Sequence, residues 1–334
     1  MRDKKHSSGS CDFGEPRKIY LGHQSEVYVN GNWAPEAEAK FHVYDQGIQS
    51  GSILFEVTRT FHQKPFRLRD HIQRLWHGLR YTHIECGLSQ EQLHDISVEV
   101  VERNNHLLGP GEEWWLEHNI SPGLMHAHRL PDSPPATVMI TVWPLAIGLA
   151  GRAKRYRSGI SLVVVPTRST RVDSVDPKVK SRTRLHYRRA GMEAARRELD
   201  AWALLLDDQG LITECPGANI LLVREGRLLY PEMIDALQGI TARQVIEFAD
   251  SLGIEARAGR LTEWDVYAAD EAFVTATSFC MLPVTRFNGA PVGSGTPGPV
   301  YLRLLSAWRE KVGLDVAAQA EWMAACLAIS SGRK

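Results

Sequence analysis

The segment LLLDDQGLITECPGANILLVREGRLLYP, residues 204–231, decides the fold class of this chain. Together with Ala203, it contains short apolar runs at 203–207, 211–214, 219–223 and 227–231. Polar turns at Asp208-Gln209-Gly210 and Glu225-Gly226 separate these runs. Short runs rich in Val, Ile and Leu, bounded by Gly, Asp and Asn, are typical of β-strands. The segment therefore predicts successive strands of one sheet.

The sequence on both sides of this segment alternates between strand and helix patterns. A strand at 161–166 and a helix at 184–199 precede it. A helix is predicted from Thr241 to near Gly253, with Thr241 and Gln244 as a capping box. A strand at 271–277 and helices at 300–312 and about 316–327 follow.

The first half of the chain shows a second group of strands and helices. Asn30-Gly31 lies between apolar residues and predicts a two-residue hairpin turn. Ser89 and Gln92 predict a capped helix start. The other expected elements are a strand at 52–61, a helix at 69–84 and strands around Trp115-Leu116 and at 136–145.

These patterns predict an α+β, or mixed α/β, enzyme with two unequal lobes. We expect a flexible tail at 1–17, a small α/β domain at 18–145 and a linker at 146–157. A larger domain at 158–334 would carry a mixed sheet or barrel and the C-terminal helices.

Composition narrows the function classes. Apolar residues make up 43% of 334, and Lys+Arg and Asp+Glu both number 39, so the net charge is zero. This balance argues against nucleic-acid and anionic-membrane partners. The five cysteines are scattered without a CxxC pair, which favours a reducing cytoplasm over a disulfide framework or a zinc-thiolate site. The N-terminus lacks the apolar core of a secretory signal, and no apolar run is long enough to span a bilayer.

Two motif matches carry little weight. Residues 293–298 match GxGxxG, but the preceding segment is rich in turns and Pro297 occupies a motif position. His126 and His128 could form half of a metal site, yet no third ligand cluster is evident, so no metal is predicted.

Four separate features suggest pyridoxal phosphate. Lys180 lies near Arg182 and Arg184, whose positive charges favour a neutral, nucleophilic amine. Glu214 ends an expected strand and could keep a pyridine nitrogen protonated. Each feature alone is more often an ordinary surface group.

The other two features concern a phosphate. Gly239-Ile240-Thr241 begins a predicted helix, where backbone N–H groups and the helix dipole attract anions. Arg74 lies on the polar side of the 69–84 helix, and a guanidinium pairs well with phosphate.

The order and spacing of these residues resemble the fold-type IV, or class IV, pyridoxal-phosphate enzymes. That family includes branched-chain aminotransferases, D-amino-acid aminotransferases and aminodeoxychorismate lyase. The resemblance runs from about Val27 to about Leu305. It includes VYVNGNW, DQGIQSGSILFEVTRTF, PFRLRDHIQRL, the Lys180 segment, residues 204–231, LQGITARQVIE and DEAFVTATSFCMLPV.

The resemblance implies roles for individual residues. Lys180 would form the Schiff base and shuttle the proton, and Glu214 would hold the pyridine nitrogen. Arg74, the backbone groups of Ile240 and Thr241, and Thr277 would hold the phosphate. Amino transfer from a small amino acid or amine to a keto acid would follow ping-pong kinetics.

Departures from the family pattern bear on the substrate. Branched-chain enzymes carry a tyrosine five residues after the lysine, where this chain has Leu185, and a strand arginine where it has Glu117. The loop MHAHRLP resembles the carboxylate-binding Arg-x-His loop of the D-amino-acid enzymes. The candidate substrate contacts are Arg59, His126, His128, Arg182 and Arg184.

Alternatives remain open at this stage. KSRTRLHY also resembles the lyase, which releases pyruvate without an acceptor, and a non-catalytic protein with this fold would lack the intact residue set. The family implies a homodimer in which the 118–131 loop completes the partner's pocket.

Overall fold

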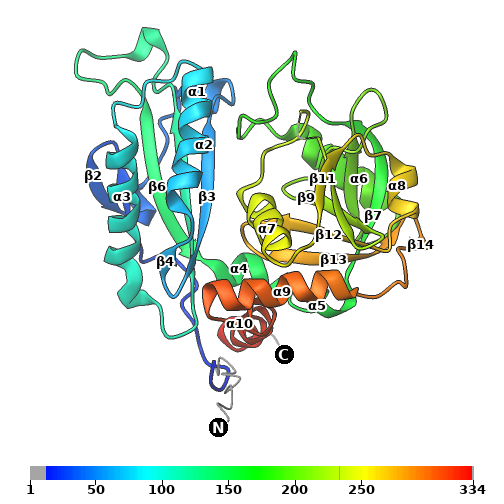
Figure 1. The fold of residues 1–334 in the computed structure, drawn as a ribbon. Coiled ribbons are helices and arrows are strands. Elements are labelled where there is room, and N and C mark those ends of the chain that lie inside the picture. The colour runs from blue at the N-terminus through cyan, green and yellow to red at the C-terminus, as the bar shows by residue number, and fades with distance from the viewer. Residues whose placement is uncertain (1–12, 233, 333–334) are drawn as a thin grey trace.

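The computed structural model describes residues 13–232 and 234–332 of the chain. Figure 1 shows two lobes side by side, each built on a sheet, with helices α9 (Pro299–Val312) and α10 (Val316–Ser331) lying across the base between them. The predicted domain boundaries remain predictions. The strands of the first sheet all lie within residues 26–144, and those of the second within residues 160–291.

The first lobe is a six-stranded sheet in the order β2-β1-β6-β5-β3-β4, and its strand pairs are antiparallel. Asn30 and Gly31 both have positive φ, at 49° and 89°, so the predicted hairpin turn between β1 and β2 is confirmed. The strands are β1 (Glu26–Val29), β2 (Asn32–Pro35), β3 (Leu54–Phe61), β4 (Lys64–Pro65), β5 (Trp114–Ser121) and β6 (Thr137–Pro144).

Two long helices cover this sheet. α2 (Leu68–Tyr81) buries Ile72, Leu75 and Leu79, as the apolar stripe predicted. α3 (Gln90–Asn104) begins at the predicted capping box of Ser89 and Gln92, which is present. The short helices of this half are η1 (Glu36–Glu38), α1 (Gln46–Gln49), η2 (Asn105–Leu107) and η3 (His126–His128).

The second lobe is a mixed sheet in the order β11-β10-β9-β12-β13-β7-β8, with β14 paired to β13. The pairs β10–β11, β13–β7 and β7–β8 are parallel, and the others are antiparallel. The strands are β7 (Ile160–Arg168), β8 (Trp202–Leu206), β9 (Asn219–Arg224), β10 (Arg227–Pro231), β11 (Ala256–Gly259), β12 (Glu271–Ala276), β13 (Cys280–Phe287) and β14 (Ala290–Pro291).

The predicted strand at 211–214 is wrong in detail. Ile212 makes only an isolated bridge to Leu206 of β8, while its N–H donates to the Leu261 carbonyl at 2.7 Å. The segment thus links β8 to the chain after β11.

The helices of the second lobe are α6 (Leu185–Arg197), α7 (Ile240–Ser251), α8 (Glu263–Tyr267), α9 and α10. The predicted capping box at Thr241 is wrong, because α7 begins one residue earlier, with Gly239 as its N-cap and no side-chain cap bond. Thr241 is instead buried in the first turn.

The expected loose linker is largely helical. It contains α4 (Leu145–Leu149), η4 (Ala150–Arg152) and α5 (Arg155–Ser158). Leu145 and Leu149 are fully buried in the same core cluster as Met323 of α10, which explains why the segment is ordered.

Contacts between the lobes lie close to α7. Phe61 and Phe66 of the first lobe pack on Trp308 of α9, and Phe248 of α7 meets the same indole edge-on at 5.2 Å. Ion pairs join Arg67 to Glu247 and Arg243 to Asp70. These contacts fix α7 against α2.

The two ends of the described chain lie together at the base (Figure 1). Phe13 stacks on Trp322 of α10 and Arg17 pairs with Glu112, so residues 13–17 of the expected tail contact the body. Residues 1–12 of that tail lie outside the described residues.

Within the described residues, no single helix has the length and apolar composition of a membrane span. The pair α9 and α10 passes that test only when taken together, with a bend of 78° between them.

Candidate active site

One cavity between the lobes brings together the residues predicted to bind the cofactor. Its lining combines residues from α2, the chain before α6, the β8–β9 connection, the start of α7 and the end of β12. These include Arg74, Lys180, Glu214, Gly239, Ile240, Thr241 and Thr277. The amine, the acid and the helix start therefore share one space.

Lys180 is held by the edge of the first sheet although it precedes α6 of the second lobe. The Phe55 N–H donates to the Lys180 carbonyl at 2.9 Å, and the Arg182 N–H donates to the Ile53 carbonyl at 2.8 Å. The Lys180 ammonium nitrogen lies 4.6 Å from the centroid of the Phe55 ring. This short strand-like pairing fixes the lysine in the cleft.

The surroundings of Lys180 lower its pKa from 10.5 to about 7. Removal of the amine from water is the main cause, and the nearby Arg184 and Arg74 charges add to it, while Glu56 and Glu214 oppose it. A substantial neutral fraction is therefore present at neutral pH, as a nucleophile requires.

Glu214 is buried on another wall of the same cavity. Tyr187 donates its hydroxyl to Glu214 Oε1, and the Leu237 N–H donates to Oε2 at 3.1 Å. Burial raises the pKa of Glu214, and these donors together with Arg184 oppose the rise. A cationic N–H placed against this carboxylate would offset the cost of burying its charge.

The start of α7 forms a close backbone surface. A Cβ at Gly239 would lie 1.9 Å from Asn219 Oδ1, so the position admits only glycine unless Asn219 moves. Asn219 Nδ2 donates to the Leu237 carbonyl at 2.8 Å and holds the preceding loop. The amides of the first turn, without a side-chain cap, form a suitable anion site.

Arg74 reaches this helix start from α2. Its Nη1 donates to the Gln238 carbonyl at 2.8 Å, and Glu56 of β3 accepts from Nε at 2.8 Å and from Nη2 at 2.7 Å. Glu56 is fully buried, and its Oε1 also lies 3.0 Å from His71 Nδ1. Arg74 and His71 keep the pKa of Glu56 well below its usual range despite burial. The acid therefore stays ionised and fixes the guanidinium.

A second cavity adjoins the first and shares Lys180, Arg184, Gly217, Ala276 and Thr277 with it. Its remaining walls are mostly apolar and aromatic, with one further cation. They include Phe55, Val57, Trp115, Arg152, Trp202 and Phe279.

Of the five candidate substrate contacts, only Arg184 lines the two cavities. Arg182 is exposed, and its guanidinium is paired with Glu117 and Asn119.

Arg59 is 2% exposed, and its guanidinium donates to Ser278 O and Gln319. It lines neither cavity, so a direct substrate contact from Arg59 does not match its position.

His126 and His128 lie on an exposed turn, and the His128 ring stacks on Tyr44 with 3.8 Å between centroids. Neither histidine lines the two cavities of its own chain.

Sequence reasoning did not identify some residues that shape the site. Tyr187 lies seven residues after Lys180, and its hydroxyl could be linked to Glu214 only by the fold. Arg152 fell in the expected linker. Glu56 lies within the family-like stretch DQGIQSGSILFEVTRTF, but its contact with Arg74 depends on how α2 packs on β3.

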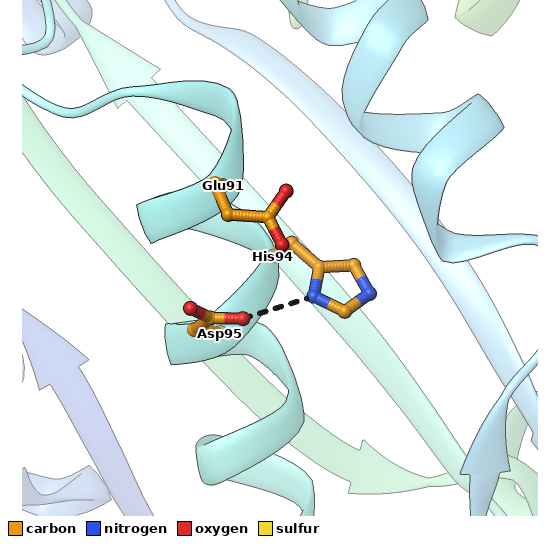
Figure 2. Close-up of side chains that lie close together, drawn as sticks. All are labelled: Glu91, His94 and Asp95. Atoms are coloured by element: carbon orange, nitrogen blue, oxygen red, sulfur yellow. Dashed lines mark hydrogen bonds and ion pairs between the residues drawn. The ribbon is translucent and has the colours of Figure 1, made fainter.

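Two other possible ligand sites, an acidic cluster on α3 and the start of α9, are already filled by side chains of the protein. Figure 2 shows Glu91, His94 and Asp95 on α3, with the His94–Asp95 contact at 3.2 Å. Arg69 already holds both oxygens of Glu91, so this exposed group is an ion-pair cluster. After the 293–298 glycine motif, Glu271 accepts from the first amides of α9 at 2.8 Å and fills that helix start.

The main cavity matches the chemistry of pyridoxal phosphate. It offers a partly neutral amine, a buried carboxylate in the same lining, and a helix start with an arginine beside it. These groups suit an aldehyde, a protonated ring nitrogen and a phosphate, respectively.

Comparison with known proteins agrees with this geometry. Residues 53–287 match the family model described as amino-transferase class IV. A putative branched-chain-amino-acid aminotransferase of Methanocaldococcus jannaschii is 30% identical, over 85% of this chain and 96% of its own length. A D-alanine aminotransferase of Listeria monocytogenes is 25% identical, over 86% and 96%.

A solved aminotransferase structure also has a similar fold. The T.th. branched-chain amino acid aminotransferase complexed with N-(5'-phosphopyridoxyl)-L-glutamate superposes with a TM-score of 0.76 at 30% identity. The match covers 88% of this chain and 95% of that one. The fold class expected from the sequence is thereby confirmed.

Proposed function

This chain belongs to the class IV aminotransferase family, and we propose that Lys180 is the residue through which it binds its cofactor and moves protons. It is a pyridoxal-phosphate-dependent aminotransferase, as its motifs predicted. The observation that carries the residue assignment is the shared cavity of Lys180, Glu214 and the start of α7.

We propose that the role of Lys180 is proton transfer. When bound, pyridoxal phosphate supplies an aldehyde that takes the amino group and a ring that accepts electrons. The Lys180 amine would take the proton from the substrate carbon that bears the amino group and would return a proton to the cofactor carbon that receives the amino group. A pKa near 7 suits a base that must both accept and release a proton.

Glu214 is proposed to hold the ring nitrogen in its protonated form. Tyr187 donates to Oε1 and the Leu237 amide donates to Oε2, so the protein orients both oxygens of the carboxylate. Burial strengthens the attraction between the carboxylate and a cationic N–H, because little water screens it.

The phosphate is proposed to lie against Ile240, Thr241, Arg74 and Thr277. The first amides of α7 and the helix dipole favour a dianion there. Glu56 and the Gln238 carbonyl hold Arg74 in place, so little side-chain entropy is lost on binding.

The substrates are proposed to be a small amino acid or amine and a keto acid, exchanged by a ping-pong mechanism. Leu185 is 80% exposed and Glu117 is paired with Arg182, which does not favour a specifically branched-chain pocket. Among the remaining candidates, Arg184 has the position best suited to touch substrate. Neither the site nor the comparisons favour the lyase alternative.

We also propose a homodimer in the cytoplasm. The turn around His126 carries the exposed Met125 and Leu130, and Tyr44 beside it is also exposed. Burial of these apolar side chains against a second copy would bring the 118–131 loop to the partner's cavity. Sedimentation velocity of wild type and of Met125→Glu tests this arrangement, and a monomeric wild type would contradict it.

A half-reaction screen tests the proposed function. Cofactor-loaded protein is mixed with L-amino acids, D-amino acids and amines, and the visible absorbance of the bound cofactor is followed. Loss of that band with at least one amino donor, and its return with a keto acid, is expected. Lys180→Ala should abolish both changes. A Lys180→Ala protein that responds like wild type would contradict the assignment.

A further inference from the structure

Arg152 is a cation of the active site that neither the motifs nor the family pattern identified. It ends η4 in the helical connection between the two sheets. Its side chain lines the second cavity together with Lys180 and Thr277, so it faces the same space as the proposed nucleophile. Leu149 and Ala153 are buried in the core, so the backbone that carries Arg152 is held in place.

The guanidinium of Arg152 lies over two aromatic rings. Its central carbon is 5.8 Å from the Trp202 ring centroid and 5.9 Å from that of Phe279. Nη1 donates to the Gly148 carbonyl. Nε is buried and has no hydrogen-bond partner within residues 13–232 and 234–332. Burial also lowers the pKa of Arg152.

Three other arginines near the site already have partners, while Arg184, which lines both cavities, donates its Nε to the Ser181 carbonyl at 2.8 Å and forms no ion pair with a described carboxylate. Arg74 is held by Glu56, Arg182 by Glu117, and Arg59 by the Ser278 carbonyl and Gln319. Arg152 forms no ion pair with a carboxylate of the described residues. A desolvated cation with an unused N–H is costly unless an anion joins it.

The rest of the cavity indicates what kind of anion fits. Phe55, Val57, Trp115 and Trp202 form largely apolar walls. An amino acid or keto acid carries one carboxylate beside a variable side chain, so it matches a single cation among apolar surfaces. Arginine binds carboxylate through parallel N–H donors of its planar guanidinium, and Arg152 lines this cavity.

We propose that Arg152 binds the carboxylate of the acid substrate and so selects amino acids and keto acids over simple amines. This inference rests on the proposed function, because the cavity is a substrate site only if Lys180 carries the cofactor. Arg152 takes the place that the strand arginine or the Arg-x-His loop would otherwise fill.

The test compares an acid with its neutral isostere. The probes are 4-methylvalerate and 4-methylpentanamide, titrated into cofactor-loaded protein by calorimetry and by the cofactor absorbance. Wild type should bind the acid more tightly than the amide. Arg152→Gln should weaken acid binding by about 10- to 100-fold, the usual loss for a charge-assisted hydrogen bond, and leave amide binding unchanged.

Two further variants sharpen the comparison. Arg152→Lys keeps the charge but not the planar fork, so an intermediate loss is expected. Arg157→Gln removes an exposed arginine of α5 that pairs with Glu321, and it should leave both affinities unchanged.

The outcomes separate this inference from the proposed function. If Arg152→Gln keeps the wild-type preference for the acid while Arg184→Gln loses it, the assignment to Arg152 is wrong. Cofactor loading by Arg152→Gln, seen as a normal visible band, shows that Lys180 still works whichever result is found. If wild type fails to load cofactor at all, the proposed function fails first.

Discussion

Replacement of Lys180 by methionine should stabilise the cofactor-free protein at pH 7. Folding brings this amine into a cleft where its pKa falls from 10.5 to about 7. In the unfolded chain the amine is protonated at pH 7, so folding must either remove its proton or bury its positive charge. Methionine has a similar length and no charge, so it removes this cost without opening a large cavity.

The magnitude follows from the pKa difference. At about 1.36 kcal/mol per unit, the shift corresponds to an upper limit of about 4 kcal/mol at pH 7. Lys180 is only partly buried, so screening by solvent reduces the expected gain to about 1–2 kcal/mol. The cost is complete below pH 7 and disappears as the pH rises toward 10.5, where the amine is neutral in both states. At pH 9.5 the gain should therefore fall to about one third of its value at pH 7, roughly 0.3–0.7 kcal/mol.

Urea unfolding of the cofactor-free protein at pH 7 and pH 9.5 measures this effect. Lys178→Met is the matched control, because Lys178 lies two residues away and pairs with Asp176. It should not stabilise the protein at either pH. A Lys180→Met protein that is no more stable than wild type at pH 7, or equally stabilised at both pH values, would refute the reasoning.

Three further predictions concern the other groups of the cavity. Glu214→Gln should lower the rate of the half-reaction by roughly 10- to 100-fold with cofactor still bound, measured by stopped-flow absorbance, because a neutral amide holds a protonated ring nitrogen weakly; an unchanged rate would contradict its role. Arg74→Gln should weaken cofactor binding by about 10- to 100-fold in equilibrium dialysis, whereas Arg80→Gln on the same helix should not. The rate of cofactor loading should rise with pH through about 7 as Lys180 loses its proton, and Arg184→Gln should move that midpoint upward; a midpoint near 10 in wild type would contradict the lowered pKa.

Much of the fold was predictable because it depends on local patterns. The Asn30-Gly31 turn requires positive φ at two successive residues, and the sequence offers residues that tolerate it. The apolar stripe of α2 and the capping box of Ser89 and Gln92 are likewise local, and both are present. Such features need no knowledge of the rest of the chain.

The incorrect predictions arise where tertiary contacts outweigh local signals. Thr241 and Gln244 have the spacing of a capping box, but the helix starts at Ile240 after a glycine that approaches Asn219 closely. The linker contains Gly148 and Gly151 and several charges, yet burial of Leu145 and Leu149 makes it helical.

The site likewise combines residues that sequence spacing identified with residues that only tertiary contacts reveal. Family-like spacing pointed to Lys180, Glu214 and the start of α7, and the fold places them around one cavity. Tyr187 and Arg152 could not be identified in this way, because their relevance depends on contacts with distant residues. Arg152 meets Trp202 and Phe279, which lie 50 and more residues further along the chain.

Borohydride reduction of the cofactor-loaded protein, followed by peptide mass spectrometry, tests the central claim most directly. Reduction fixes the cofactor to whichever amine holds it. The account predicts that the added mass appears on the peptide segment that contains Lys180, and that Lys180→Ala acquires none. Attachment to Lys178 or to any other lysine, with Lys180 unmodified, would contradict it.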